Sequence, residues 1–397
     1  MSNTIAAVPG YLGQDFESAA PGHRFYLYLQ FWQRTRSGGL ELQKAKAESL
    51  TRALKLGNND KATMAALAER QERLAGDHVW RLPAKSVAPL TTGLGMEHPL
   101  ENGFAFLSPY GLPYLPGSGI KGVLRQAARE LQQDGDPQWQ QTETADPIAE
   151  LFGNSTGDDG KRGALIFWDA FPVLPRTAES LAPDVMTPHQ THYYRDGEAP
   201  HDSGQPNPIL FVTIPPGAQF EFFVDCKTSL LAPELAASNR WQTLLQDAFE
   251  YAFDWLGFGA KTAVGYGQME IDREEQKERH EQAERARAEA EETARIKQAT
   301  ADLPPDAATI EAQIQRGGWS GNEDFIDWME QWLDGLQASE LSTQAWQRVE
   351  QQMIRHFDKS ILVDPDAMKK RNKPKYKGRK KDLAKRLLQL KPNGDNT

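Results

Sequence analysis

One segment of this sequence differs in composition from the rest and divides the chain. From Arg273 to Gln298 the residues are almost entirely Glu, Arg, Ala, Gln and Lys, without a glycine or a proline. This composition predicts a long solvent-exposed helix that is stabilised by charge pairs four residues apart, and it lacks the sustained heptads of a coiled coil. Pro304 and Pro305 end the pattern. We therefore expect a folded domain before this helix and a separate region after it.

The domain organisation that we expect follows from these changes in composition, because 397 residues allow more than one domain. Amphipathic segments with Trp319, Trp328, Trp332 and Trp346 predict a small helical module after the prolines. In order, the expected parts are a first domain at 1–271 with a helical insertion at about 40–77, a charged helical linker at 272–300, a Trp-rich helical module at 301–360, and a basic tail at 361–397.

Charge is distributed unevenly along the chain. The formal net charge is -10, yet residues 369–386 hold eleven Lys or Arg against the single acid Asp382. That segment therefore carries +10, which leaves -20 for the rest. A concentrated basic block in an acidic protein indicates an anionic partner, and Tyr376 in the block could stack on a base. A solvated tail, or a tail that pairs with the acidic remainder of the chain, explains the block equally well.

Other features of the composition exclude several classes of protein. The single cysteine, Cys226, excludes a disulfide framework and a thiolate zinc site, and we expect it to be a small buried hydrophobe. The chain opens without a signal-peptide pattern and has no apolar run of about 18 residues. We therefore expect a soluble cytoplasmic protein with no membrane partner.

The spacing of apolar residues in the first domain predicts alternating strands and helices. Strands are expected in HRFYLYLQFW (23–32), ALIFWDAF (164–171) and ILFVTI (209–214), and at 218–226, where Phe220, Phe222, Val224 and Cys226 share one face. Helices are expected at 120–131, at about 233–256, and on both sides of a break at Gly57–Asn59, with Asp60 as an N-cap. After the helix at about 233–256, the segment to Ile271 is expected to be a glycine-rich loop that enters a last strand. The order strand, helix, strand, strand, helix, strand predicts an α+β fold with a ferredoxin-like (RRM-like) core. This topology permits RNA binding without establishing it.

A glycine-rich helix start is the first candidate site. In LPGSGIKGVLR (115–125) the glycines precede a helix, Ser118 is a candidate cap, and Lys121 and Arg125 follow in the first turns. Free N–H groups, the positive end of the helix dipole and two cations together predict an anion site. A capped helix that merely carries surface cations is the alternative.

A glycine-rich loop is the second candidate site. LGFGAKTAVGYG (256–267) has neither the glycine spacing of a dinucleotide fingerprint nor the Gly-Lys-Ser/Thr of a Walker loop. What remains is four glycines around Lys261, which would let a phosphate backbone approach main-chain N–H groups beside a positive charge. Tight backbone geometry at the entry to a strand would also require glycines.

A histidine-rich segment is the third candidate. His189 and His192, with Asp184 and His201 nearby, resemble the ligands of a metal-dependent nuclease. The pair lacks the helical spacing of four residues that zincins use, and no glutamate accompanies it. We therefore expect no metal, no cofactor and no catalytic residue here, and instead a loop whose His and Tyr side chains contact bases or a neighbouring subunit.

PGSGIKGVLR followed by GFGAKTAVGYG resembles the signature pair of the RAMP superfamily, the repeat-associated RNA-binding subunits of CRISPR effectors. TTGLGMEHPLENG (91–103) and DVMTPHQTHYY…NPILF (184–211) are similar to the family of sixth subunits in type III-B (Cmr) effector complexes. The resemblance covers roughly residues 85–271. The region after Asp272 has no counterpart in the family pattern.

The resemblance implies a non-catalytic RNA-binding and assembly subunit that caps the backbone near the 3′ end of the guide RNA. Its implied partners are guide RNA, target RNA, the backbone RAMP subunit, the small helical subunit and a neighbouring RAMP subunit, with target cleavage in another subunit. Implied RNA-binding residues are Gly117, Ser118, Gly119, Lys121, Arg125, Gly259, Lys261, Thr262, Gly265 and Gly267. The histidine-rich segment adds His189 and His192, and the basic block adds Lys377, Arg379 and Lys380.

Two other functions remain open at this point. Some relatives with this fold cleave CRISPR repeat RNA with a histidine and without a metal, so a RAMP-fold endoribonuclease that processes CRISPR transcripts is the enzyme alternative. A stand-alone scaffold that needs no RNA is the third class.

Overall fold

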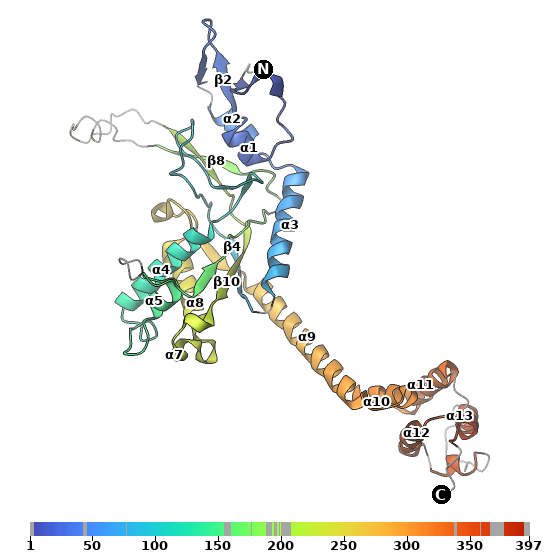
Figure 1. The fold of residues 1–397 in the computed structure, drawn as a ribbon. Coiled ribbons are helices and arrows are strands. Elements are labelled where there is room, and N and C mark those ends of the chain that lie inside the picture. Colours follow the sequence, from blue (N-terminus) through green and yellow to red (C-terminus); the bar gives the residue numbers. More distant parts are fainter. Residues whose placement is uncertain are drawn as a thin grey trace. The chain divides into compact units, whose positions relative to one another are not determined.

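A computed structural model describes residues 4–42, 46–76, 78–154, 160–175, 177–187, 208–336, 340–357, 359–365 and 377–392, together with 193, 197 and 199. The chain forms two units, residues 1–276 and 277–397 (Figure 1). Each unit has its own hydrophobic core. Among the described residues, no helix combines the length and the apolar character that crossing a bilayer requires.

A four-stranded sheet forms the centre of the first unit, which has an α+β fold as predicted. Its strands are β4 (Trp80–Ser86), β7 (Leu165–Phe167), β10 (Gln219–Cys226) and β11 (Met269–Ile271), in the order β11-β4-β10-β7. Each neighbouring pair is antiparallel. Helix α4 (Gly117–Gln133) lies between β4 and β7 in the chain, and α8 (Arg240–Tyr251) lies between β10 and β11. The order strand, helix, strand, strand, helix, strand is therefore present.

The first strand of this order is not the one that the sequence indicated. It is β4, a central strand that pairs with both β10 and β11, whereas the sequence indicated residues 23–32. Pro83 obscured the pattern, because a proline within a run normally argues against a central strand. Here Pro83 lies opposite Glu221 of β10, and its carbonyl accepts the N–H of Asp272.

Side chains of β10 show why both faces of the sheet are covered. Phe220, Phe222 and Val224 are buried against the core that contains α4 and α8, as their alternation predicts. Phe223 points to the opposite face, where it is buried with Ala75 at the end of α3 (Asn58–Ala75). In Figure 1, α4, α5 (Pro147–Phe152) and α8 lie on one side of β4 and β10, and α3 lies on the other. Cys226 is half-buried, and burial followed by the charge of Asp225 raises the pKa of its thiol to about 12.

The two helices flanking the sheet follow their apolar stripes. Ile120, Leu124, Ala127 and Ala128 are buried, which confirms the helix predicted at 120–131. The second helix begins later than predicted. A short helix, α7 (Pro233–Ala236), is separated from α8 by Ser238 and Asn239, whose φ angles of 50° and 55° break the helix. A π-helical turn, Ala252–Leu256, ends it.

The strand expected at 23–32 is wrong in its first half. Residues Pro21–Tyr26 form helix α1, and only Gln30–Arg34 form a strand, β2. Pro21 occupies the first helical turn, and Phe25 is buried with its ring stacked 3.7 Å from that of His98. This contact is distant in sequence, so local alternation does not reveal it.

Helices form on both sides of the break predicted at Gly57–Asn59. Helix α2 (Lys46–Ala53) and α3 flank Gly57, but Gly57 is the N-cap and Asp60 is the third residue of α3. The Asp60 carboxylate accepts the N–H of Gly57 at 2.8 Å. The remaining strands form a sheet of β1 (Ile5–Ala6), β2 and β3 (Leu40–Leu42), and the hairpins β5 (Phe106–Leu107) with β6 (Leu112–Pro113) and β8 (Ala182–Met186) with β9 (Ile209–Thr213).

The second unit is helical. The charged segment forms α9 (Arg273–Thr300), which has no buried residue, and its first residues belong to the first unit. Helices α10 (Pro305–Gln315), α11 (Asn322–Gly335), α12 (Thr343–His356) and α13 (Lys377–Gln389) share one core. Helix α13 contributes Leu383, Ala384 and Leu387 to that core. The structure therefore differs from the division into a module at 301–360 and a tail at 361–397, because the last helix is part of the module.

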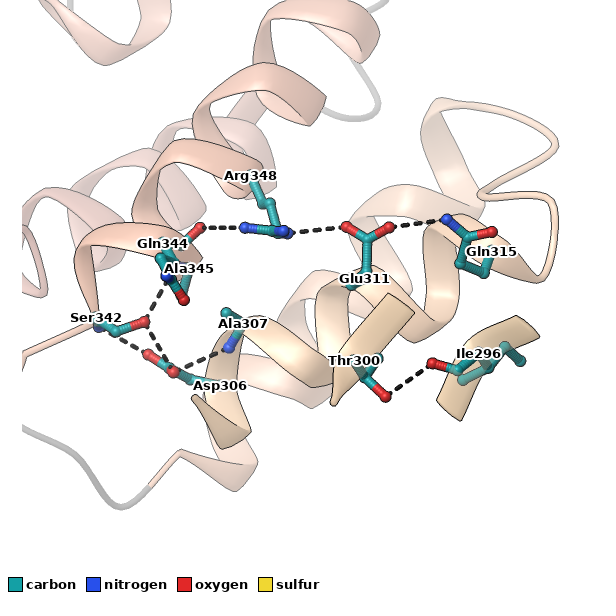
Figure 2. A network of polar contacts seen from close by, with 10 residues as sticks. All are labelled: Ile296, Thr300, Asp306, Ala307, Glu311, Gln315, Ser342, Gln344, Ala345 and Arg348. Carbon is teal, nitrogen blue, oxygen red and sulfur yellow. Dashed lines mark hydrogen bonds and ion pairs between the residues drawn. The ribbon is translucent and has the colours of Figure 1, made fainter. Parts of the chain in front are cut away.

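Polar contacts fix α10 to α12 (Figure 2). The Asp306 carboxylate accepts the N–H and the hydroxyl of Ser342, which itself caps α12. Arg348 Nε donates to Glu311 at 2.8 Å, and both side chains are partly buried. A hydrogen bond from Gln315 and the pairing with Arg348 outweigh burial and lower the pKa of Glu311.

Leu387 tests whether α13 belongs to the core of the second unit. Its side chain is fully buried, so Leu387→Ala should lower the free energy of unfolding by about 2–5 kcal/mol. Gln389→Ala, an exposed position on the same helix, should change it by less than about 0.5 kcal/mol. Hydrogen exchange of α11 and α12 amides under increasing urea measures both values. Equal stability of the two variants would show that α13 is not part of the core.

Candidate nucleic-acid interface

The start of α4 is built differently from the sequence prediction. Its N-cap is Pro116, and Ser118 is exposed and makes no capping hydrogen bond. The carboxylate of Asp169 accepts the N–H of Gly117 at 2.8 Å and so occupies the positive end of the helix. A Cβ on Gly117 would lie 2.4 Å from the carbonyl oxygen of Phe167, so close packing requires this glycine. Gly119 is exposed with open space around it.

A third cation, Arg162, lies close enough to the cations on α4 to repel Lys121, and the sequence alone did not indicate it. Burial, followed by repulsion from Arg125 and Arg162, lowers the pKa of Lys121. Arg162 lies after α5, at a bridge with Gly153, and is exposed. Within the described part of the chain, no carboxylate forms an ion pair with Lys121, Arg125 or Arg162. We call these three residues the α4 cation cluster. The sequence shows a Lys-Arg pair in GKRG (160–163), which marks a local positive charge, but no pattern in the sequence places this pair beside α4.

Three of the loop glycines have a structural reason. Gly257, Gly259 and Gly267 have φ angles of 70°, 90° and 73°. A Cβ on Gly259 would lie 2.2 Å from the carbonyl oxygen of Thr91, and one on Gly267 would lie 1.8 Å from that of Phe258. Gly265 also has a positive φ, but the space around it is open. Tight backbone geometry, the alternative left open by the sequence, therefore accounts for the glycines at 257, 259 and 267.

Lys261 joins the loop to the β8–β9 hairpin. It has a left-handed φ of 61°, and its ammonium lies 3.3 Å from Met186 Sδ and 5.3 Å from the ring centroid of Phe211. Tyr266 donates a hydrogen bond to Asp184 at 2.6 Å, and burial together with Asp184 raises its pKa to about 12. Thr262, half-buried, lies against Gly257. Two segments that the sequence analysis treated separately are therefore in contact.

The histidine segment falls outside the described residues. This applies to His189, His192 and His201, whereas Asp184 lies on β8 and accepts the hydrogen bond from Tyr266. Among the residues that are described, no group of three or more His, Cys, Asp and Glu could hold a metal ion. The predicted roles of His189 and His192 stay predictions.

Two of the three basic residues predicted on the C-terminal block are used inside the second unit. Arg379 Nε donates to Glu330 at 2.8 Å and its Nη2 pairs with Asp327 at 2.5 Å, and these hydrogen bonds raise its pKa. Lys380 is buried with its ammonium 4.3 Å from the ring centroid of Phe357, and burial lowers its pKa. Lys377 begins α13, and its side chain is not described. Pairing with acidic residues of the chain, the alternative noted above, therefore applies to Arg379.

Two loop glycines provide a test of their different roles. Gly265→Ala should lower the free energy of unfolding by about 1–2 kcal/mol, because alanine is strained at a left-handed φ even where the surrounding space is open. Gly267→Ala should lower the free energy of unfolding by more than about 3 kcal/mol, because the new Cβ would also collide with the backbone of Phe258. Urea unfolding followed by hydrogen exchange of β10 amides gives both values. Equal costs for the two substitutions would contradict the packing argument.

Comparisons with known proteins support the family resemblance. Residues 84–270 match the model of the RAMP superfamily. The chain is 29% identical over 236 residues to the CRISPR system Cmr subunit Cmr6 of Pyrococcus furiosus, a match that covers 47% of this chain and 66% of that protein. It is 26% identical over 173 residues to the Cmr6 subunit of Saccharolobus solfataricus, covering 44% of this chain and 50% of that protein. The matches thus span between half and about two thirds of these relatives.

Solved structures of similar proteins carry related descriptions. A chain in a cryo-EM structure of the type III-B Cmr-beta complex bound to cognate target RNA is 24% identical, with a TM-score of 0.41, covering 57% of this chain and 69% of that one. The crystal structure of Cmr6 from Pyrococcus furiosus is 26% identical, with a TM-score of 0.27, and the match covers 49% of this chain and 98% of that one. On the sequence matches, residues 84–270 of this chain are similar to the RAMP superfamily, and the chain is similar to Cmr6 subunits.

Proposed function

We propose that this protein is a non-catalytic RNA-binding and assembly subunit of a type III-B CRISPR ribonucleoprotein. The RAMP match carries the proposal, because residues 84–270 include both the α4 cation cluster and the glycine loop. The protein would act in the cytoplasm, cap the backbone near the 3′ end of the guide RNA, and support interference with target RNA in antiviral defence. A ferredoxin-like core is part of this proposal, supported by the antiparallel strand order β11-β4-β10-β7.

RNA binding is supported by the unneutralised charge at α4. Burial, and then repulsion from Arg125 and Arg162, disfavours the charged form of Lys121 and lowers its pKa. A phosphate placed among the three cations would relieve that repulsion. Ser118 and Gly119, exposed on the first turn, leave room for an RNA backbone to approach. Such contacts recognise phosphates rather than sequence, so base pairing between guide and target would supply the specificity.

The assembly role is supported by the names of the relatives, which are subunits of Cmr systems. The proposed partners are therefore guide RNA, target RNA and other Cmr subunits, including the backbone RAMP subunit, the small helical subunit and a neighbouring RAMP subunit. In this proposal Lys261 holds the β8–β9 hairpin in place, through Met186 and Phe211, rather than acting chiefly as a phosphate ligand.

A non-catalytic role is supported by the state of His98, which lies within the RAMP match. Its Nδ1 accepts the N–H of Leu100 at 3.1 Å, so its Nε2 carries the proton and donates to the carbonyl of Phe25 at 3.0 Å. Burial lowers the pKa of this histidine. Both ring nitrogens are thus engaged with the backbone, which leaves neither available for proton transfer to an RNA.

Substituting two residues of the α4 cation cluster tests the RNA-binding part of the proposal. Lys121→Gln with Arg162→Gln should weaken binding of single-stranded RNA alike for all sequences, because phosphate contacts carry no sequence information. The slope of log affinity against log salt should fall by about 1.4 for two lost contacts. Fluorescence anisotropy over a salt series measures both quantities. Arg70→Gln, an exposed cation on α3, is the matched control, and double-variant binding that equals this control contradicts the proposal.

Incubation with CRISPR repeat RNA tests the non-catalytic part. The purified protein should leave the RNA intact with or without divalent metal, and His189→Ala with His192→Ala should not alter target cleavage by an assembled complex. Denaturing gels of labelled RNA report both results. Specific repeat cleavage that disappears in the double histidine variant would establish the endoribonuclease instead.

A further inference from the structure

A cavity of about 340 Å³ lies near the N-terminus, away from the residues used in the proposed function. Its walls come from the segment before α1, from α1 and the chain that leads into β2, from α2, and from the turn before α3. Helices α1 and α2 are in contact and lie side by side in Figure 1. The volume falls in the range of small-ligand sites, roughly 300–1,000 Å³. The cavity is therefore large enough for one nucleotide.

Cations predominate among the charged residues of this cavity. Arg24, Arg52 and Lys55 line it, against a single lining carboxylate, Glu17. Among the described residues, none of the three cations forms an ion pair with a carboxylate. Arg52 is exposed, and its Nη2 donates to the neutral hydroxyls of Thr4 and Ser49, each at 3.4 Å. The lining therefore attracts an anion.

Arg24 places a fixed guanidinium at the wall. Its Nη groups donate to the carbonyls of Arg52 and Lys55, which holds the end of α2 against α1. Its Nε is buried and has no acceptor among the described residues. Burial lowers the pKa of Arg24, and Asp60 and Glu17 offset this only in part. A guanidinium that is desolvated without a paired carboxylate favours an incoming phosphate.

An aromatic pair forms another part of the wall. Phe16 and Tyr28 line the cavity and stack on each other, with ring centroids 4.3 Å apart and planes within 4°. Both side chains are half-buried. Base stacking on such rings is worth about 1–3 kcal/mol per base, whichever base it is. The cavity thus combines a flat apolar surface with cations, the two elements by which proteins bind an unpaired nucleotide.

We propose that this cavity binds one unpaired nucleotide, with its phosphate among Arg24, Arg52 and Lys55 and its base against the Phe16–Tyr28 pair. The nucleotide comes either from an RNA strand or from the free nucleotide pool, since both present the same phosphate, sugar and base. The site uses none of the α4 cation cluster, so it stands independently of the proposed function.

The test compares ligands and variants on the full-length protein. Calorimetry with adenosine 5′-monophosphate, adenosine and inorganic phosphate separates the base from the charge. Adenosine 5′-monophosphate should bind at least tenfold more tightly than either part. The double variant Arg52→Gln, Lys55→Gln changes exposed side chains only, and it should weaken this binding at least tenfold. Arg70→Gln is the control, and Lys121→Gln with Arg162→Gln should leave this binding unchanged.

A photocrosslink locates the base. RNA with a single 4-thiouridine, irradiated with the protein, should crosslink to the peptide that contains Phe16 or Tyr28, and excess adenosine 5′-monophosphate should reduce that crosslink. Tighter binding of the RNA than of the free nucleotide at this site assigns the ligand to a strand, and equal binding assigns it to the free pool. The proposal is overturned if inorganic phosphate binds as well as the nucleotide, if the Arg52, Lys55 variant binds like the control, or if crosslinks form only elsewhere. Loss of RNA binding in the Lys121, Arg162 variant, together with unchanged nucleotide binding in the Arg52, Lys55 variant, would leave the proposed function intact and exclude this site.

Discussion

The close approach of the glycine loop to residues 89–93 joins three segments of the part of this protein that matches the RAMP model. Gly267 donates its N–H to the carbonyl of Pro89, and Ala260 donates to that of Thr91 at 2.7 Å. The hydroxyl of Thr91 in turn donates to the carbonyl of Val212 in β9. The chain leaving β4, the chain entering β11 and the β8–β9 hairpin therefore meet at one point. A Cβ on Gly259 would collide with the carbonyl of Thr91, and one on Gly267 with the carbonyl of Phe258. These collisions explain both glycines without reference to a ligand.

The charges of the chain fall into internal and available groups. On α13, Arg379 and Arg386 pair with Asp327, Glu330 and Asp334 of α11, so much of the described basic helix serves to dock it. By contrast, the cations of the α4 cluster have no acidic partner among the described residues. A high local density of lysine and arginine is therefore a poor guide to a binding surface by itself. The presence or absence of an ion pair between each cation and a carboxylate is a better indicator of a binding surface.

Features that depend on local spacing could be predicted from the sequence, and features that depend on distant contacts could not. The apolar stripe of α4 and the alternation of β10 are determined by neighbours three or two residues apart, and both were predicted correctly. Helix α1 was missed because Phe25 is buried by His98, which is far away in the sequence. The local sequence favours Ser118 as the cap of α4, whereas the carboxylate that accepts the N–H of Gly117 belongs to Asp169, 52 residues away. Arg162 was missed for the same reason.

Recovery of RNA from cells tests the central claim most directly, namely that this protein is an RNA-contacting subunit of a Cmr assembly. The tagged full-length protein is expressed in cells that carry a type III-B CRISPR locus, crosslinked with ultraviolet light and purified under conditions that keep complexes intact. Sequencing of the bound RNA should yield guide RNAs from that locus, mass spectrometry should identify Cmr subunits, and crosslinked peptides should include residues 117–129. Purification without guide RNA or Cmr subunits above the untagged background would contradict the account.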